Sequence, residues 1–99
     1  MIVHNEVPVS PATVAGAWSG NTEDIKGGKT GLLYVAPTTS STQYNLTVTG
    51  PDNEVIVSET ALVGTHCDCT PIAVRGIYTI AISGASVDEA FVIKWSVVE

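Results

Sequence analysis

The chain has 99 residues, of which 44% are hydrophobic and only 14% charged, and its formal net charge at pH 7 is -6. This length fits a single domain and is too short for a two-domain enzyme. Ten Asp and Glu outnumber four Lys and Arg, which is the wrong sign of charge for neutralising phosphates, so the composition argues against a nucleic-acid partner.

The residue types favour β-strands over helices. Fourteen Val, eight Ile and twelve Thr stand against four Leu, and β-branched side chains are enriched in strands. The first residues contain no basic region and no long apolar run, which predicts no secretory signal. The longest apolar stretches of the sequence are only a few residues, which predicts no membrane span. We therefore expect an all-β product made inside the cell, in a reducing compartment where Cys67 and Cys69 are free thiols.

The N-terminal segment, residues 1–11, is predicted to be an extended arm beside a single domain of residues 12–99. Pro8 and Pro11 interrupt this segment, and proline supplies no N–H for a strand ladder. The apolar residues of the arm lack the periodicity of a central strand, so we expect them to contact a neighbouring subunit. These residues are Ile2, Val3, Val7 and Val9.

Three segments follow the arm. Residues 12–18 are predicted to form a first core strand with Val14 and Trp18 directed inward. Residues 19–31 are polar and glycine-rich and are predicted to be a long loop. Residues 30–36 form a dense apolar run that predicts a buried strand.

A hairpin is predicted at the centre of the chain. Apolar residues alternate strictly over residues 44–49, and residues 50–53 contain Pro and Asn, two residue types that favour turns. A four-residue loop would place the apolar side chains of both strands in the core. The resulting register pairs Thr49 with Glu54, Val48 with Val55 and Leu46 with Val57.

The C-terminal part of the chain continues the strand pattern. Short strands are predicted at residues 61–64 and 72–74, and a single helical turn at residues 88–90. Alternation predicts seven inward side chains in the last two strands: Tyr78, Ile80, Ile82, Phe91, Ile93, Trp95 and Val97. Seven to nine short strands without helical periodicity favour an antiparallel two-sheet β-sandwich.

Residues 76–82 are similar to the penultimate strand of immunoglobulin-like modules. In that family a Tyr two residues before the central core position bonds its hydroxyl to the preceding corner, which implies this role for Tyr78 and a corner at residues 72–76. Ile80 stands where antibody domains carry a core cysteine, so antibody membership is excluded. The resemblance implies an immunoglobulin-like sandwich, and a jelly roll is the second choice.

A phosphate-binding loop is suggested by Gly27-Gly28-Lys29-Thr30 but fails in context. The full motif requires a Gly where this chain has Glu23, and it requires a helix where residues 31–35 read as a strand. We therefore interpret this segment as a loop containing a lysine.

His66, Cys67 and Cys69 are the candidate metal ligands. Two Cys at i and i+2 on a strand share a face, whereas His66 would point the other way, and a closed zinc site normally needs a second pair of ligands. A further ligand would have to come from His4 or from another subunit. We expect no metal and no cofactor, with a disulfide between subunits left open.

Catalytic residues are not indicated by the pattern. Neither of the two His residues lies in a recognisable nucleophile context, and the acidic residues Asp52, Asp88 and Glu89 fall in predicted loops, which indicates a solvated surface. We therefore expect a protein that is not an enzyme.

The sequence predicts a small, acidic β-sandwich that is rich in Thr and Val and has a proline-interrupted arm. This combination resembles the small accessory proteins of tailed-phage virions, particularly capsid decoration or cement proteins. The resemblance implies a non-enzymatic structural protein of a virus particle, made in the host cytoplasm and located in the virion. It implies the major capsid protein or other virion subunits as partners and a homo-oligomer, taken as a trimer by analogy. The alternative is an immunoglobulin-like adhesive or carbohydrate-binding module, which would be exported and would display exposed aromatic side chains.

Overall fold

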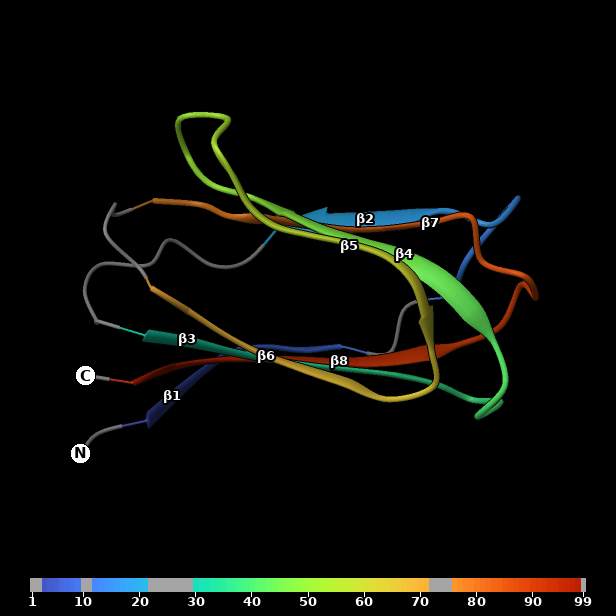
Figure 1. Ribbon diagram of the computed structural model, residues 1–99. Helices are drawn as coiled ribbons and strands as arrows, with labels where there is room; N and C mark the ends of the chain where they lie inside the picture. The colour runs from blue at the N-terminus through green and yellow to red at the C-terminus, as the bar shows by residue number, and fades with distance from the viewer. Residues whose placement is uncertain (1–2, 10–11, 22–29, 72–75, 99) are drawn as a thin grey trace.

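A computed structural model describes residues 3–9, 12–21, 30–71 and 76–98. These ranges hold eight strands that form two four-stranded antiparallel sheets, stacked as two layers in Figure 1. The predicted all-β sandwich is therefore confirmed. The strands are β1 (Val3–Val9), β2 (Trp18–Asn21), β3 (Thr30–Pro37), β4 (Gln43–Thr49), β5 (Val55–Val63), β6 (His66–Pro71), β7 (Thr79–Ser83) and β8 (Phe91–Val98). The described ranges include no helix of the length and apolarity that a membrane span requires.

The order of the strands is that of a jelly roll. One sheet has the order β1-β8-β3-β6 and the other β2-β7-β4-β5. The pairs β1·β8, β2·β7, β3·β6 and β4·β5 are nested, as in one long hairpin folded back from the tip between β4 and β5. The pairs β3·β8 and β4·β7 then join these ladders into two sheets, and this wrapping is the eight-stranded jelly roll.

The first-choice immunoglobulin-like topology is therefore wrong, and the second choice is confirmed. An immunoglobulin sandwich keeps its first two strands in one sheet, whereas here β1 and β2 lie in different sheets. Residue patterns within one strand report which face is buried, but they do not report which strands are neighbours, because both folds present the same alternation.

The core lies between the sheets and is formed mainly by alternate residues of the inner strands β3, β4, β7 and β8. Tyr44 packs edge-on against Phe91, with ring centroids 5.2 Å apart and an interplanar angle of 82°. The inward side chains predicted for the last two strands are buried wherever the structure describes them. The core consists of Leu33, Val35, Tyr44, Leu46, Val48, Val57, Tyr78, Ile80, Ile82, Phe91, Ile93 and Trp95.

The hairpin exists, but its predicted register is wrong. Gly50 N–H donates to the Glu54 carbonyl at 2.8 Å, and Asn53 adopts the left-handed conformation with φ 62°. The loop is therefore one residue shorter than expected, and a one-residue slip moves side chains to the other face. A register shift next to the turn then pairs Val48 with Val57, while Val55 is 61% exposed.

Residues 12–17 form a turn instead of the predicted first core strand. Ala15 and Gly16 both have positive φ angles, of 52° and 79°, which reverses the chain. Val14 is 76% exposed, so its predicted inward position is wrong. Trp18 opens β2 and packs, partly buried, against the core. Residues 19–21, which were predicted to be loop, belong to β2. Residues 22–29 of that loop, with Gly27, Gly28 and Lys29, lie outside the described residues.

Residues 3–9 form an edge strand of the sandwich, where the sequence predicted an arm outside it. β1 pairs with β8 along its length, with an irregularity between Asn5 and Val7. Pro8 is compatible with this position because an edge strand has one side without a partner. Ile2 lies outside the described residues.

The predicted strand at residues 61–64 is the end of β5 and not a separate element. Ala61 interrupts the ladder with φ 55°, and its N–H donates to the side-chain carbonyl of Asn45 at 3.0 Å. This irregularity bends the edge strand toward the connection to β6. Residues 72–75, which contain the predicted strand at 72–74 and most of the Tyr78 corner, lie outside the described residues.

Candidate docking face

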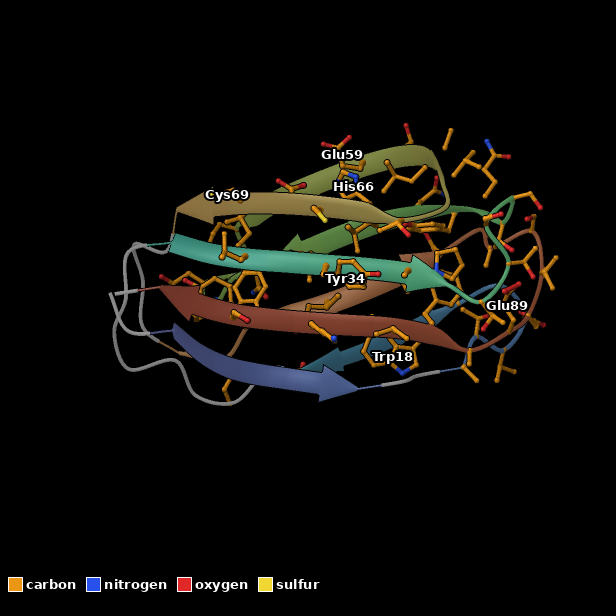
Figure 2. All side chains as sticks on the ribbon, turned by 90° about the horizontal axis from the view of Figure 1, so that it is seen from below. Trp18, Tyr34, Glu59, His66, Cys69 and Glu89 are labelled. Carbon is orange, nitrogen blue, oxygen red and sulfur yellow. The ribbon has the colours of Figure 1, made fainter. Side chains whose placement is uncertain are left out.

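The β1-β8-β3-β6 sheet turns one face to the core and the other to the outside. Side chains on β3, β6 and β8 that point away from the core form what we call the outer face, which is turned toward the viewer in Figure 2. Antiparallel register places them in two rows across the strands. The rows are Cys69, Leu32 and Ser96, and Cys67, Tyr34 and Lys94.

The outer face is apolar for an outward-facing sheet surface. Leu32 is 41% exposed, Tyr34 37% and Val92 40%. By contrast, the outward side chains of the central strand β4 in the other sheet are polar, for example Asn45 and Thr47. A strand that is apolar on both faces is typical of a sheet covered on both sides, so this surface has the character of a contact surface.

An open depression lies on this face, with a cavity volume of about 490 Å³. The ammonium group of Lys94 lies 5.8 Å from the centroid of the Tyr34 ring, within range of a cation–π contact. The depression is lined by Leu32, Leu33, Tyr34, Cys67, Asp68, Cys69, Lys94 and Ser96.

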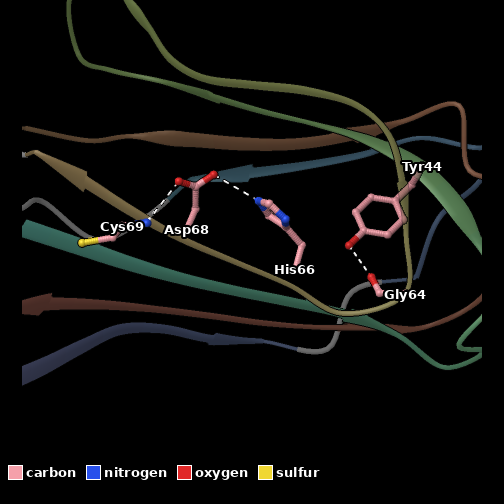
Figure 3. A network of polar contacts seen from close by, with 5 residues as sticks. All are labelled: Tyr44, Gly64, His66, Asp68 and Cys69. Carbon is pink, nitrogen blue, oxygen red and sulfur yellow. Dashed lines mark hydrogen bonds and ion pairs between the residues drawn. The ribbon is translucent and has the colours of Figure 1, made fainter.

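The two cysteines lie on the outer face, as their spacing predicted. Both are free and exposed. His66 is on the opposite face of β6, where its Nε2 lies 3.1 Å from an Asp68 carboxylate oxygen, as Figure 3 shows. The other Asp68 oxygen accepts a hydrogen bond from the backbone N–H of Cys69 at 3.1 Å.

Of the candidate metal ligands, the two cysteines share the outer face, but neither histidine lies with them. His4 belongs to β1, at the opposite edge of the sheet from β6. His66 faces away from both thiols. Within the described ranges, no group of three or more His, Cys, Asp or Glu residues is arranged to hold a metal ion.

Asp88 and Glu89 hold together three loops at one end of the sandwich. Asp88 accepts hydrogen bonds from the backbone N–H groups of Ala15 and Gly16 at 3.1 and 2.7 Å. Glu89 accepts from the Thr39 N–H at 2.7 Å and from the Thr42 hydroxyl at 2.9 Å. The two carboxylates therefore stabilise the loops through hydrogen bonds and are not merely solvated charges. The helical turn predicted at residues 88–90 does not form.

The hydrogen bonds lower the pKa of Glu89. Desolvation of the carboxylate acts to raise the pKa. Hydrogen bonds from the backbone of Thr39 and the hydroxyl of Thr42 act to lower it, and smaller hydrogen-bond contributions come from the Thr39 side chain and the Thr38 backbone. Together these bonds outweigh the desolvation. The ionised form of Glu89 is therefore the one that the folded protein stabilises.

The predicted contact residues are on the opposite edge strand. Val3, Val7 and Val9 lie in β1, where their backbones pair with Val98, Trp95 and Ile93 of β8. The sequence missed Leu32 and Tyr34, because a continuous apolar run predicts a buried strand and does not distinguish a covered outer face from a core.

Comparisons with known proteins give a structural likeness. No family model matches the chain. No curated protein matches it either. A solved chain from "Structure of infectious bursal disease virus Gx strain" is similar in fold, with a TM-score of 0.47 and 12% sequence identity. The likeness covers 96% of this chain and 30% of the viral chain, so this chain spans less than a third of that protein's length.

Proposed function

We propose that this protein is a non-enzymatic structural component of a virus particle that decorates or cements the capsid through protein–protein contacts. Its partners in this proposal are the major capsid protein or other virion subunits. It is made in the host cytoplasm and is then located in the virion. Tailed-phage particles are the proposed setting, following the resemblance to decoration proteins.

The outer face is the observation that supports this proposal most strongly. Leu32, Tyr34 and Val92 present apolar surface on the outer side of the sheet, and Lys94 adds a positive charge beside them. Burial of apolar area drives protein association at about 25 cal/mol per Å² before the costs of binding. A broad face of this kind suits shape-matched packing against another protein.

The fold adds support of a general kind. Jelly rolls are an architecture of viral capsid domains and also of lectins, so the fold is compatible with the proposed role. Edge strand β1 offers a second contact, because among the described strands it pairs only with β8, and the backbone on its other side can pair with a partner strand. We keep Ile2, Val3, Val7 and Val9 as proposed contact residues, and a closed homo-oligomer, a trimer, as the proposed assembly.

The test uses particles purified by density gradient from the organism that encodes the chain. Quantitative mass spectrometry measures the ratio of the 10.3 kDa chain to the main shell subunit in each gradient fraction. The proposal predicts one fixed ratio across the particle peak that persists after washing with high salt. Absence of the chain from the particles, or a ratio that varies between fractions, would contradict the proposal.

A carbohydrate-binding module is the second candidate, and the exposed ring of Tyr34 is the observation in its favour. Sugar rings commonly stack on such aromatic faces, but the Lys94 ammonium lies over this ring at 5.8 Å. A glycan-array screen of the isolated chain separates the candidates. Binding that is lost in Tyr34→Ala would support the module, and the virion proposal predicts no such binding.

A further inference from the structure

Cys67 and Cys69 are two free thiols on the same face of the same edge strand. Both are exposed, and both line the depression on the outer face. Their neighbours across the ladder are Tyr34 and Leu32, respectively. The pair is therefore presented to solvent side by side.

The spacing of the two thiols selects among the ways they can react together. Two steps along a strand separate the Cα atoms by about 6.6 Å, which is at the far limit of the range of about 4.4–6.8 Å that disulfides tolerate. Rotation about χ1 brings each Sγ part of the way toward the other. An ion bonded to both sulfur atoms at about 2.3 Å holds the sulfur atoms about 4.6 Å apart when the two bonds are in line. In a tetrahedral site the same bonds hold the sulfur atoms only about 3.8 Å apart.

We propose that Cys67 and Cys69 form a two-thiolate site for a single soft monovalent cation of the Cu(I) and Ag(I) class. Thiolates are the ligands that such ions prefer. Linear two-coordination needs no third ligand, which fits a pair that has no other His, Cys, Asp or Glu arranged to complete a metal cluster within the described ranges. The proposal concerns the isolated chain and is independent of the virion role.

Binding is an exchange of protons for the metal ion. Each S–H bond breaks, both protons pass to solvent, and two S–metal bonds form with no change in oxidation state. Two thiolates and one monovalent cation leave the site with one negative charge. Lys94 lines the same depression and supplies a positive charge that offsets it.

The same geometry disfavours zinc. A structural zinc ion requires four ligands, and His66 lies on the other face of β6 with its ring bound to Asp68. A second chain would have to supply two more thiolates, which would give one ion for two chains and a dimer. Stoichiometry and mass therefore separate the two kinds of site.

The experiment titrates the reduced full chain with Ag(I) and records native mass spectra and the near-ultraviolet absorbance of the thiolate–metal bonds. We expect one Ag(I) per chain, an unchanged monomer-to-oligomer distribution and the release of two protons per ion. Cys67→Ser and Cys69→Ser should each weaken binding by roughly a hundredfold or more, because the chelate effect of the second thiolate is lost. His66→Asn is the matched control and should bind as the wild-type chain does.

Three results would overturn the proposal. The first is a Ser variant of either cysteine that binds as tightly as the wild-type chain. The second is one ion for two chains with dimer formation, which would indicate a site shared between copies. The third is a large loss of binding in His66→Asn, which would make the histidine a ligand.

Discussion

The Tyr44 hydroxyl donates a hydrogen bond to the Gly64 carbonyl oxygen at 2.6 Å inside the core. Tyr44 belongs to β4 in one sheet, and Gly64 lies in the connection that carries the chain from β5 into β6 of the other. The bond therefore fixes the point where the chain changes sheets. It also positions the start of β6, the strand that bears Cys67 and Cys69. Figure 3 shows the bond beside β6.

Tyr44→Phe should lower the free energy of unfolding by about 1–3 kcal/mol at neutral pH. The substitution leaves the buried Gly64 carbonyl without its partner while keeping the ring that packs on Phe91. Chemical denaturation monitored by fluorescence measures the change. Tyr34→Phe, on the outer face, is the control and should change stability by less than about 0.5 kcal/mol. Equal effects of the two substitutions would contradict the role of the bond.

Alkaline pH should destabilise the wild-type protein through the same residue. Burial, with a contribution from the negative charge of Cys67, raises the pKa of Tyr44 to about 12. A raised folded-state pKa contributes stability that is complete below the unfolded value near 10 and is lost as pH rises toward about 12. Melting temperatures between pH 9 and 12 should fall more steeply for the wild-type chain than for Tyr44→Phe. Equal slopes of melting temperature against pH for the two chains would show that ionisation of Tyr44 does not cause the loss of stability between pH 9 and 12.

The hairpin register predicts different tolerance at two valines. Val48 is fully buried, so Val48→Asp places an unpaired carboxylate in the core and should cost about 4 kcal/mol or more. Val55 is 61% exposed, so Val55→Asp should cost less than about 0.5 kcal/mol. Circular dichroism and thermal melts measure both. Unfolding of the Val55→Asp variant would contradict the observed register and support the one predicted from the sequence, which pairs Val48 with Val55.

Acid should weaken the loop end of the sandwich through Glu89. The hydrogen bonds from Thr39 and Thr42 hold the pKa of Glu89 below its ordinary value. A lowered folded-state pKa contributes stability that is present above the unfolded value and is lost as pH falls through the folded one. Glu89→Gln should therefore be less stable than the wild-type chain at pH 7, and the difference should shrink as pH falls below about 4. A difference that stays constant from pH 7 to pH 2.5 would exclude this linkage.

Ala61→Gly should stabilise the protein. Ala61 has φ 55° in β5, a left-handed conformation that costs a residue with a Cβ about 1–2 kcal/mol. Glycine relieves this strain, but its greater conformational entropy in the unfolded chain offsets part of the stabilisation. The expected increase is about 0.5–1 kcal/mol by denaturant titration. Ala81→Gly in the ordinary strand β7 is the control and should destabilise. A loss of stability in Ala61→Gly would contradict the irregularity at this position.

The burial pattern of this fold is predictable from the sequence, but the register and topology are not. Tyr78, Ile80 and Ile82 follow the two-residue period of a strand, so the face they bury is evident from the alternation. Val55 shows the limit, because a loop shortened by one residue and an adjacent register shift decide its face. The strand order depends on contacts between segments far apart in the chain, which local patterns do not encode.

The candidate site was less predictable than the core, for two physical reasons. Leu32 and Tyr34 lie in an apolar run that gives no sign of which face meets the core. Asp88 and Glu89 act on backbone N–H groups more than 45 residues away in the chain, and no spacing rule relates a carboxylate to a distant loop. The shared face of Cys67 and Cys69 was predictable, because it depends only on the period of one strand.

The most direct test of the central claim measures how much of each variant binds to purified particles that lack the chain. Leu32→Glu places a charge in the middle of the outer face, and Val63→Glu places the same charge at an exposed position of β5 in the other sheet. Both variants are first confirmed to be folded by circular dichroism. We predict that Leu32→Glu lowers particle affinity tenfold or more, equivalent to about 1.4 kcal/mol, while Val63→Glu binds as the wild-type chain does. Wild-type occupancy by Leu32→Glu, or equal loss by both variants, would contradict docking through the outer face.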